Sequence, residues 1–341
     1  MNIDTFVIRV DASERIGLGH LNRCLLIANF IKKKGFFVVF ITEQPLSQSI
    51  IKSKNFQCLN INKEGNIERL DFTKLYKSFV VIADVNTGAI FENTQDYFNY
   101  LDNLRRGAKL LITLEDLVDY PYCSDVAIVP YCGAVNLKLK SDCNTKYLLG
   151  TDYFALRSEF DNNNFIVHKS AKKILITMGG GDPEQITQKV LKSIRQIETP
   201  CDITVVLGKA SKTSIKDINK IMCNYKSIVT VLCDVESMSK LMLDCDVAIT
   251  NSGLTKYELS ALGVPSIIIS NNKQQAFYSE GFSNYGSSIH LGDISVVSEK
   301  YIRENCVNLM QNYKLRLNMS EKGKRLVDSN GLNRIWKAIF N

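Results

Sequence analysis

The stretch that decides the fold reads Arg9-Val-Asp-Ala-Ser-Glu-Arg-Ile-Gly-Leu-Gly-His20-Leu-Asn-Arg23 and continues the apolar run that begins at Thr5. A strand here passes through a glycine-bearing turn directly into a segment whose apolar residues, from Leu21 to Ile31, recur at helical spacing. Backbone N–H groups at a helix start are unpaired and carry the positive end of the helix dipole, so such a turn readily receives an anion. The junction therefore predicts a βα unit, with His20 at its turn.

Short β-branched runs alternate with helical patterns along the whole chain, which is typical of buried parallel strands. The expected strands of the first half are Thr5–Val10, Gly35–Thr42, Val80–Asp84, Leu110–Leu114 and Val126–Val129. After the polar segment Asp161–Lys173, the expected strands of the second half are Ile174–Met178, Ile203–Leu207, Val229–Leu232, Val247–Thr250 and Ser266–Ile269.

This repeated plan predicts an α/β fold of two doubly wound, Rossmann-like domains that face a cleft. The length of 341 residues, 45% of them hydrophobic, is sufficient for two cores. We place the domains at residues 1–165 and 166–341. The last helical stretch, Leu315–Phe340 with a break near Gly331, is a candidate to cross back to the first domain.

The charge pattern argues against two classes of partner. The formal net charge of +7 comes mostly from dispersed lysines, without a basic block interleaved with aromatics, so we expect no nucleic-acid partner. The N-terminus lacks the pattern of a signal peptide, and no apolar run reaches about 18 residues, the length of a membrane span. We expect a cytoplasmic protein without an integral membrane segment.

The ten cysteines are scattered, with no CxxC pair and no Cys/His cluster at zinc spacing. Several, such as Cys233 and Cys245, fall inside apolar runs, which is typical of small buried side chains in a reducing compartment. The sequence therefore predicts neither a disulfide framework nor a metal site.

A second strand–glycine junction reads Met178-Gly179-Gly180-Gly181-Asp182-Pro183 and precedes a helical pattern from Ile186 to Ile194. Three glycines let the backbone approach a ligand closely. Their spacing matches neither the dinucleotide fingerprint nor the Walker A loop. The structural alternative is a tight turn in which Asp182 caps the helix and Pro183 occupies its first position.

A third junction reads Asn251-Ser-Gly-Leu-Thr-Lys-Tyr-Glu258. Ser252, Gly253 and Thr255 can donate hydroxyl and amide hydrogens to a diphosphate, and Glu258 can accept ribose hydroxyls. Alternatively, Asn251 or Ser252 caps the helix and Glu258 completes a solvent-facing turn. Two anion-ready junctions in one domain favour nucleotide binding there.

His20 has two interpretations. A lone histidine at a helix start is often a capping or packing residue. The helix dipole also disfavours the imidazolium form, which leaves a neutral ring able to accept a proton. The junction alone does not choose between a cap and a base. His168, in the presumed linker, and His290, late in the chain, are expected to be structural or exposed.

Four blocks carry a resemblance to a known family, and they span roughly residues 5 to 275. They are Arg9-x-Asp11-x-Ser13-x-x-Ile16-Gly17-x-Gly19-His20-x-x-Arg23, Gly150-x-x-Tyr153-x-x-Leu156-Arg157-x-Glu159-Phe160, Met178-Gly179-Gly180-x-Asp182, and Ser252 to Glu258 with the later Asn272 and Gln274. In order and spacing they resemble the nucleotide-sugar hydrolases of the pseudaminic-acid pathway, which remove UDP from a UDP-linked diacetamido-trideoxy-altropyranose. That family has the GT-B architecture of the MurG-type glycosyltransferases.

The resemblance implies displacement of UDP at the anomeric carbon without a metal or redox cofactor. His20 would act as general base on water, and Asp11 would help to orient the site. The residues implied to bind the sugar are Gly17, Gly19, Arg23, Asp84, Asn86, Tyr153 and Arg157. Those implied to hold UDP are Gly179, Gly180, Gly181, Asn251, Ser252, Gly253, Thr255, Glu258, Asn272 and Gln274.

One position departs from the family pattern. Family members carry an Asp-His-Tyr-like segment where this chain reads Asp84-Val-Asn86, so an amide replaces the active-site tyrosine. The same base and UDP pocket would also serve a GT-B glycosyltransferase that passes the sugar of a UDP- or CMP-sugar to a hydroxyl acceptor. A non-catalytic nucleotide-sugar-binding protein is the third interpretation. For Asn272 and Gln274, a polar loop is the structural alternative. The oligomeric state does not follow from the sequence.

Overall fold

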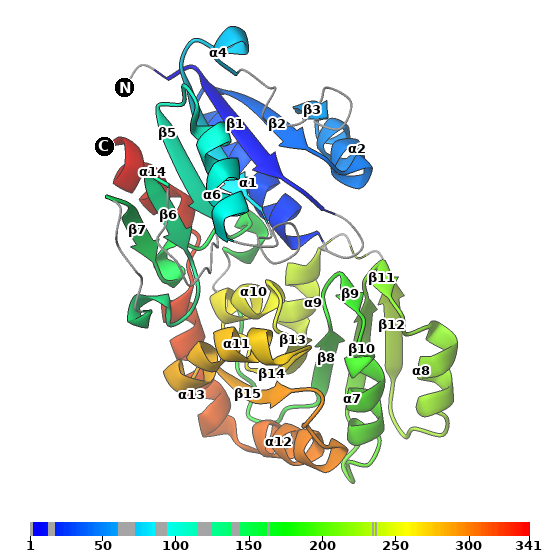
Figure 1. Cartoon of the computed structure of the whole chain (residues 1–341). Coiled ribbons are helices and arrows are strands. Elements are labelled where there is room, and N and C mark those ends of the chain that lie inside the picture. Colours follow the sequence, from blue (N-terminus) through cyan, green and yellow to red (C-terminus); the bar gives the residue numbers. More distant parts are fainter. Residues whose placement is uncertain are drawn as a thin grey trace. The chain divides into compact units, whose positions relative to one another are not determined.

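The chain forms two compact units in the computed structural model (Figure 1). Unit 1 comprises Met1–Ala155 and Asn330–Asn341, and unit 2 comprises Leu156–Ser329. The structure describes residues 3–12, 18–60, 72–85, 94–114, 124–137, 144–161, 164–233, 235 and 237–341. The predicted boundary at residue 165 therefore lies within unit 2, because the segment after Ala155 makes its side-chain contacts there: Arg157 binds Glu258.

Unit 1 is built on a parallel sheet with the strand order β3-β2-β1-β4-β5-β6-β7. Its strands are β1 (Thr5–Val10), β2 (Phe37–Thr42), β3 (Gln57–Asn60), β4 (Phe79–Asp84), β5 (Leu110–Leu114), β6 (Val126–Val129) and β7 (Lys146–Leu149). Its helices are α1 (Gly19–Lys33), α2 (Pro45–Ser53), α4 (Phe72–Leu75), α6 (Thr94–Arg105) and α14 (Gly331–Phe340), with the short 3-10 turns η2 (Ala134–Asn136) and η3 (Thr151–Tyr153). The order reverses between β1 and β4, and ligands of open α/β sheets bind beyond the carboxyl ends of such strands.

Helices cover both faces of this sheet (Figure 1). On one face, Ile8 and Val10 of β1 pack with side chains of α1 and α14. On the other face, Val7 packs with side chains of α6, such as Leu101. Successive residues of a strand point to opposite faces, so a strand that is buried on both faces is mostly apolar. Thr5–Val10 is buried along its whole length, and its one charged residue, Arg9, is paired with Asp11 and Glu43.

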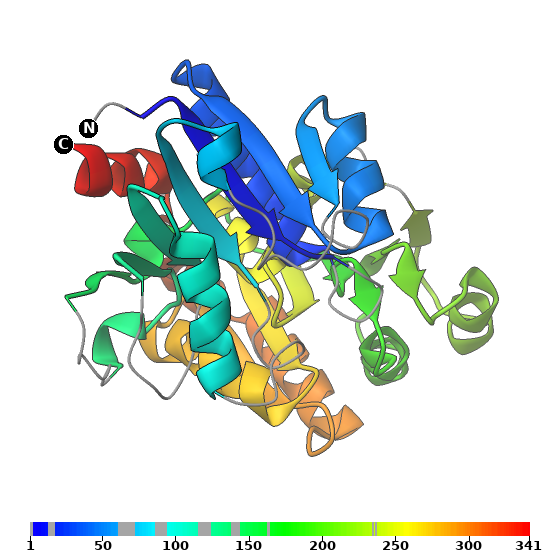
Figure 2. The same ribbon diagram turned by 45° about the horizontal axis from the view of Figure 1, so that its top comes forward.

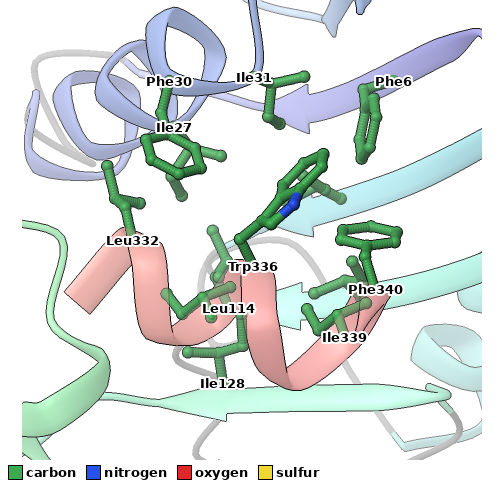
Figure 3. A pocket seen from close by; sticks show the side chains of 13 residues that line it. Phe6, Ile27, Phe30, Ile31, Leu114, Ile128, Leu332, Trp336, Ile339 and Phe340 are labelled. Carbon is green, nitrogen blue, oxygen red and sulfur yellow. The ribbon is translucent and has the colours of Figure 1, made fainter. Parts of the chain in front are cut away.

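The C-terminal helix α14 belongs to unit 1, drawn in red with the strands of that unit in Figures 1 and 2. The ring of Trp336 lies 6.0 Å from that of Phe6 and 5.4 Å from that of Phe36, between centroids. Figure 3 shows Leu332 and Trp336 of α14 lining an apolar pocket opposite side chains of α1. Of the stretch Leu315–Phe340, only the part after the break belongs to unit 1, whereas α13 (Tyr313–Leu326) belongs to unit 2.

Unit 2 has a second parallel sheet with the order β12-β10-β8-β13-β14-β15 and a small parallel pair, β9 with β11. Its strands are β8 (Lys173–Thr177), β9 (Gly181–Asp182), β10 (Asp202–Leu207), β11 (Ala210–Ser211), β12 (Val229–Cys233), β13 (Val247–Asn251), β14 (Ser266–Ser270) and β15 (Ser288–Asp293). Its helices are η4 (Ser158–Phe160), α7 (Ile186–Ile194), α8 (Ile215–Ile221), α9 (Met238–Asp244), α10 (Thr255–Leu262), α11 (Lys273–Tyr285), α12 (Glu299–Gln311) and α13 (Tyr313–Leu326). Here the order reverses between β8 and β13.

All ten predicted strands form, within one or two residues of the predicted bounds. Five further strands were not predicted: Gln57–Asn60, Lys146–Leu149, Gly181–Asp182, Ala210–Ser211 and Ser288–Asp293. The expectation for the cysteines was wrong at Cys233, which is exposed at the end of edge strand β12, whereas Cys245 is buried as expected. Among the described residues, no helix is long and apolar enough to span a membrane.

Docking of α14 depends on a glycine at its first residue. A Cβ atom placed on Gly331 would lie 1.9 Å from the carbonyl oxygen of Phe154, and a backbone atom cannot easily move away. We predict that Gly331→Ala lowers the free energy of unfolding of unit 1 by about 1–3 kcal/mol through overpacking. Denaturant unfolding followed by the fluorescence of Trp336, the one tryptophan of the chain, measures this loss.

Asn333→Ala is the matched control, because Asn333 is exposed on the same helix and its replacement should change stability by less than about 0.5 kcal/mol. If Gly331→Ala unfolds at the same denaturant concentration as the wild type, the contact does not limit the docking of α14.

Candidate functional site

The order reversal in unit 1 brings His20, Arg23 and Asp84 together. His20 and Arg23 are on the first turns of α1, and Asp84 is the last residue of β4. The His20 Nδ1 atom lies 2.6 Å from Asp84 Oδ1, and Arg23 donates to the same carboxylate from Nε at 2.9 Å and from Nη2 at 2.8 Å. The carboxyl end of β4 thus holds an Asp–His pair with an arginine behind it.

This geometry selects one form of the imidazole ring. Arg23 Nη2 also lies 3.3 Å from His20 Nδ1, but the 2.6 Å contact with the carboxylate is much shorter. A carboxylate only accepts, so Nδ1 carries the hydrogen and Nε2 of the neutral ring has a free lone pair. The side chain of His20 is 24% exposed, so the ring is open to a small reactant.

Asp84 is held as an anion. Burial raises the pKa of this carboxyl, but the charge of Arg23 and the contact with His20 outweigh burial and lower the pKa to about 2. The thiol of Cys24 also donates to Asp84 Oδ2 at 3.4 Å, and burial raises the pKa of that thiol well above its ordinary value. Asp84 therefore orients the histidine and stabilises an imidazolium without itself taking the proton.

Asp11 lies in a different cluster. Its carboxylate accepts from Arg9 at 2.6 Å, from the Thr42 hydroxyl at 2.8 Å and from the backbone N–H of Glu43 at 2.9 Å. Arg9 also donates to Tyr100 of α6, so this cluster belongs to the α6 face of the sheet, whereas Asp84 meets α1. Asp11 was expected to help to orient the site; the carboxylate in contact with His20 is that of Asp84.

The other residues implied to bind the sugar belong to both units. Gly19 is the first residue of α1, and Tyr153 is half-buried in η3 against the core of unit 1. Arg157 belongs to unit 2, where it pairs with Glu258. Gly17 and Asn86 lie outside the described residues.

The order reversal in unit 2 brings the second and third junctions together. The side chain of Asn251 donates to the Met178 carbonyl at 2.6 Å and accepts from the Gly253 N–H at 3.0 Å. Gly179 has a φ of 69°, a conformation that favours glycine, and a Cβ on Gly180 would meet nothing within 4 Å. One amide therefore joins two glycine turns whose backbone is open to close approach.

The second junction confirms one structural alternative and corrects another. Asp182 accepts from the N–H groups of Ile186 at 2.8 Å and Thr187 at 3.0 Å, as a cap of α7 does. Pro183, however, lies in the turn before α7, whose first residue is Ile186, because β9 ends at Asp182 and a turn follows it. Gly181 is part of β9 rather than of an open loop.

At the third junction both structural alternatives are wrong. The described residues give no side-chain cap to α10: Asn251 is engaged with Met178 and Gly253, and the Ser252 hydroxyl bonds that of Ser270. Glu258 does not face solvent, since its side chain is only 13% exposed and lies 2.8 Å from Arg157. Burial raises the pKa of this carboxyl, against the opposing effect of Arg157.

Two later amides are near the start of α11. Asn272 caps this helix by accepting from the Gln275 N–H at 2.9 Å, and Gln274 is exposed. Sequence reasoning missed a set of polar side chains behind the third junction, formed by Lys256, Ser270 and His290. The signal in the sequence that could have indicated this set is Lys256, a lysine within the helical pattern Thr255–Leu262. No group of three or more potential metal ligands occurs within the described ranges.

Comparisons with known proteins agree with this architecture. Spore coat polysaccharide biosynthesis protein SpsG of Bacillus subtilis is 24% identical over 338 residues, which cover 97% of this chain and 96% of that protein. The UDP-2,4-diacetamido-2,4,6-trideoxy-beta-L-altropyranose hydrolase of Campylobacter jejuni is 23% identical over 243 residues, 69% of this chain and 80% of that protein. The crystal structure of Acinetobacter baumannii MurG matches with a TM-score of 0.70 at 13% identity, over 99% of both chains. No family model matches.

The resemblance noted in the motifs is therefore confirmed as a similarity to a hydrolase of that name. The likeness to MurG concerns the fold, and it confirms two parallel-sheet α/β domains of the GT-B type.

The buried ion pair of Asp84 predicts an acid-sensitive contribution to stability. Asp84→Asn leaves the Arg23 charge buried without its counter-charge, so we expect a loss of about 3–5 kcal/mol at neutral pH. The pKa of Asp84 is lowered from 3.8 to about 2 in the folded protein, so its contribution is complete above about pH 4 and is lost as the pH falls toward 2. The difference between variant and wild type should shrink over that range.

Denaturant unfolding at a series of pH values, followed by Trp336 fluorescence, measures this difference. Asp102→Asn, at an exposed position of α6, is the control and should remain close to the wild type throughout. A variant-to-wild-type difference that stays constant between pH 7 and about pH 2 would contradict the assignment.

Proposed function

We propose that the chain is a nucleotide-sugar hydrolase that releases UDP from a UDP-linked diacetamido-trideoxyhexose, with His20 as general base on water. The observation that carries the proposal is the 2.6 Å contact between His20 and Asp84 beyond the carboxyl end of β4. The similarity to the Campylobacter jejuni hydrolase supports the choice of substrate. The proposed reaction is part of nonulosonic-acid biosynthesis.

In the proposed reaction, water attacks the anomeric carbon of the sugar. Nε2 of His20 takes a proton as the new C–O bond forms, while the bond from the anomeric carbon to the phosphate oxygen breaks and UDP leaves with the electron pair. Asp84 stays ionised and stabilises the imidazolium through Nδ1. Arg23 contributes by keeping the pKa of Asp84 low.

In the same proposal, unit 2 binds UDP. The start of α10 offers N–H groups without a side-chain cap, and the Gly179–Gly180 backbone leaves room for a phosphate. Ser252 and Thr255 supply hydroxyl groups beside these amides. Glu258 is proposed to accept the ribose hydroxyls, in a position where Arg157 already fixes one of its oxygens.

A glycosyltransferase is the second candidate. It is favoured by Asn86, which stands where the hydrolases carry a tyrosine, and by the similarity to a protein named for spore coat polysaccharide biosynthesis. In that case a sugar hydroxyl replaces water as the group that His20 deprotonates, and the nucleotide is UDP or CMP. Mass spectrometry of the products from UDP- and CMP-sugars, with and without hydroxyl acceptors, separates the candidates. Nucleotide release that depends on an acceptor identifies a transferase, and tight binding without turnover identifies a binding protein.

His20→Ala should lower the rate of UDP release about 10²- to 10⁴-fold, because the variant lacks a group that accepts the proton of water. A coupled assay for UDP formation measures the rate, and titration with UDP checks that the nucleotide still binds. His168→Ala is the matched control, since His168 pairs with Asp246 in unit 2. Unchanged turnover in His20→Ala would rule out this base.

Glu258→Gln should weaken UDP binding about 10- to 100-fold, because hydrogen bonds from ribose hydroxyls to a charged acceptor are replaced by bonds to a neutral amide. Isothermal titration calorimetry measures the dissociation constant. Glu321→Gln, at an exposed position of α13, should bind UDP as the wild type does. Equal affinity in Glu258→Gln and the control would remove Glu258 from the nucleotide site.

A further inference from the structure

A chain of three polar side chains lies directly behind the third junction. The Ser252 hydroxyl bonds the Ser270 hydroxyl, and Ser270 Oγ lies 2.9 Å from Nε2 of His290. These residues come from the loop after β13, the end of β14 and the middle of β15, which are neighbours in the sheet. Ser270 is fully buried and His290 is half-buried. The proposed phosphate-binding loop is thus connected to a titratable group.

The position of Ser252 is fixed from its other side by Lys256. The buried ammonium group donates to the Ser252 carbonyl at 2.7 Å and to the Ser279 hydroxyl at 3.1 Å. It also lies 5.5 Å from the centre of the Phe282 ring. With its carbonyl and its hydroxyl both engaged, Ser252 has little freedom, and the direction of its hydrogen bonds becomes the property that can change.

That direction follows from counting hydrogens. A hydroxyl has one hydrogen to donate and two lone pairs. If Nε2 of His290 accepts from Ser270, then Ser270 must accept from Ser252, and the single Ser252 hydrogen is used inside the protein. If Nε2 donates to Ser270, the Ser270 hydrogen is no longer held by the ring. Ser270 can then donate it to Ser252, which frees the Ser252 hydrogen. A neutral imidazole allows either direction according to its tautomer, whereas an imidazolium must donate.

We infer that His290 is a positioning residue for nucleotide binding: acting through Ser270, it sets whether the Ser252 hydroxyl donates to a phosphate of a nucleoside diphosphate. The inference rests on the proposed UDP site. Protonation of His290 favours hydrogen bonds that all run from His290 through Ser270 and Ser252 toward the ligand. A bound diphosphate in turn favours the protonated ring. Binding therefore couples to uptake of a proton.

The charged groups around His290 determine the pH range over which nucleotide binding is coupled to proton uptake. Burial and the charge of Lys256 on α10 lower the pKa of His290, and Glu280 on α11 opposes them. The free protein therefore holds a neutral ring at neutral pH. Nucleotide affinity should rise as the pH falls below about 6.5, the ordinary pKa of histidine.

The test is calorimetric titration of the full chain with UDP between pH 5 and pH 8. The phosphate of UDP titrates in this range for every variant, so the measured quantity is the ratio of wild-type to variant affinity. The comparison variant is His290→Gln, which keeps a hydrogen-bonding amide that does not titrate. The ratio of wild-type to His290→Gln affinity should rise about five- to tenfold as the pH falls, which corresponds to the free energy of one hydrogen bond. His168→Gln, the control, should follow the wild type.

Ser252→Ala separates the hydrogen-bond chain from simple attraction by the imidazolium charge. This variant keeps His290 but lacks the terminal hydroxyl, so the gain at low pH should disappear. A gain that persists in Ser252→Ala, or identical profiles for the wild type and His290→Gln, would overturn the inference while leaving the UDP site intact. Absence of UDP binding by the wild type at every pH would overturn the proposed function, and the inference with it.

Discussion

The rest of unit 1 depends on the buried ion pair between Asp84 and Arg23. An ionised carboxylate is costly to bury, and here the cost is offset by a guanidinium that donates at 2.9 and 2.8 Å. Because Arg23 and His20 are three residues apart on α1, both reach the same carboxylate. The Asp84 carboxylate that holds α1 on the sheet through Arg23 therefore also orients the imidazole of His20.

Unit 2 repeats the topology with a different polar residue at the reversal. There Asn251 ends β13, and its neutral amide links the Met178 carbonyl to the Gly253 N–H. A carboxylate in that position would repel a diphosphate, whereas an amide leaves the positive end of α10 uncompensated. The order reversal in unit 1 thus holds a negatively charged side chain, and the one in unit 2 holds a neutral amide, as the proposed general base and the proposed UDP site require.

The central strands of the two large sheets could be predicted from the sequence, whereas of their four edge strands only β12 was predicted. Thr5–Val10 and Leu110–Leu114 are mostly apolar because they are buried on both faces, and their bounds were predicted correctly. Of the unpredicted strands, β3, β7 and β15 lie at sheet edges, where exposure permits short and polar sequences, and β9 and β11 form the short two-stranded pair. His20 was proposed as a base from its junction, and Asp84 was named as a sugar-binding residue. Their contact was not predicted, because the sequence does not reveal which face of the sheet a carboxylate near the end of a strand will occupy.

The return of the chain through α14 affects the order in which the protein can fold during synthesis. Domains generally fold as the ribosome releases them, the N-terminal one first. In this chain Trp336 and Phe340 pack on Phe6 of β1, so the first domain to be made is the last to receive its full core. The apolar surface of unit 1 that α14 covers therefore stays exposed while all of unit 2 is translated. A single short helix at the end of the chain thus sets when the core of unit 1 is complete.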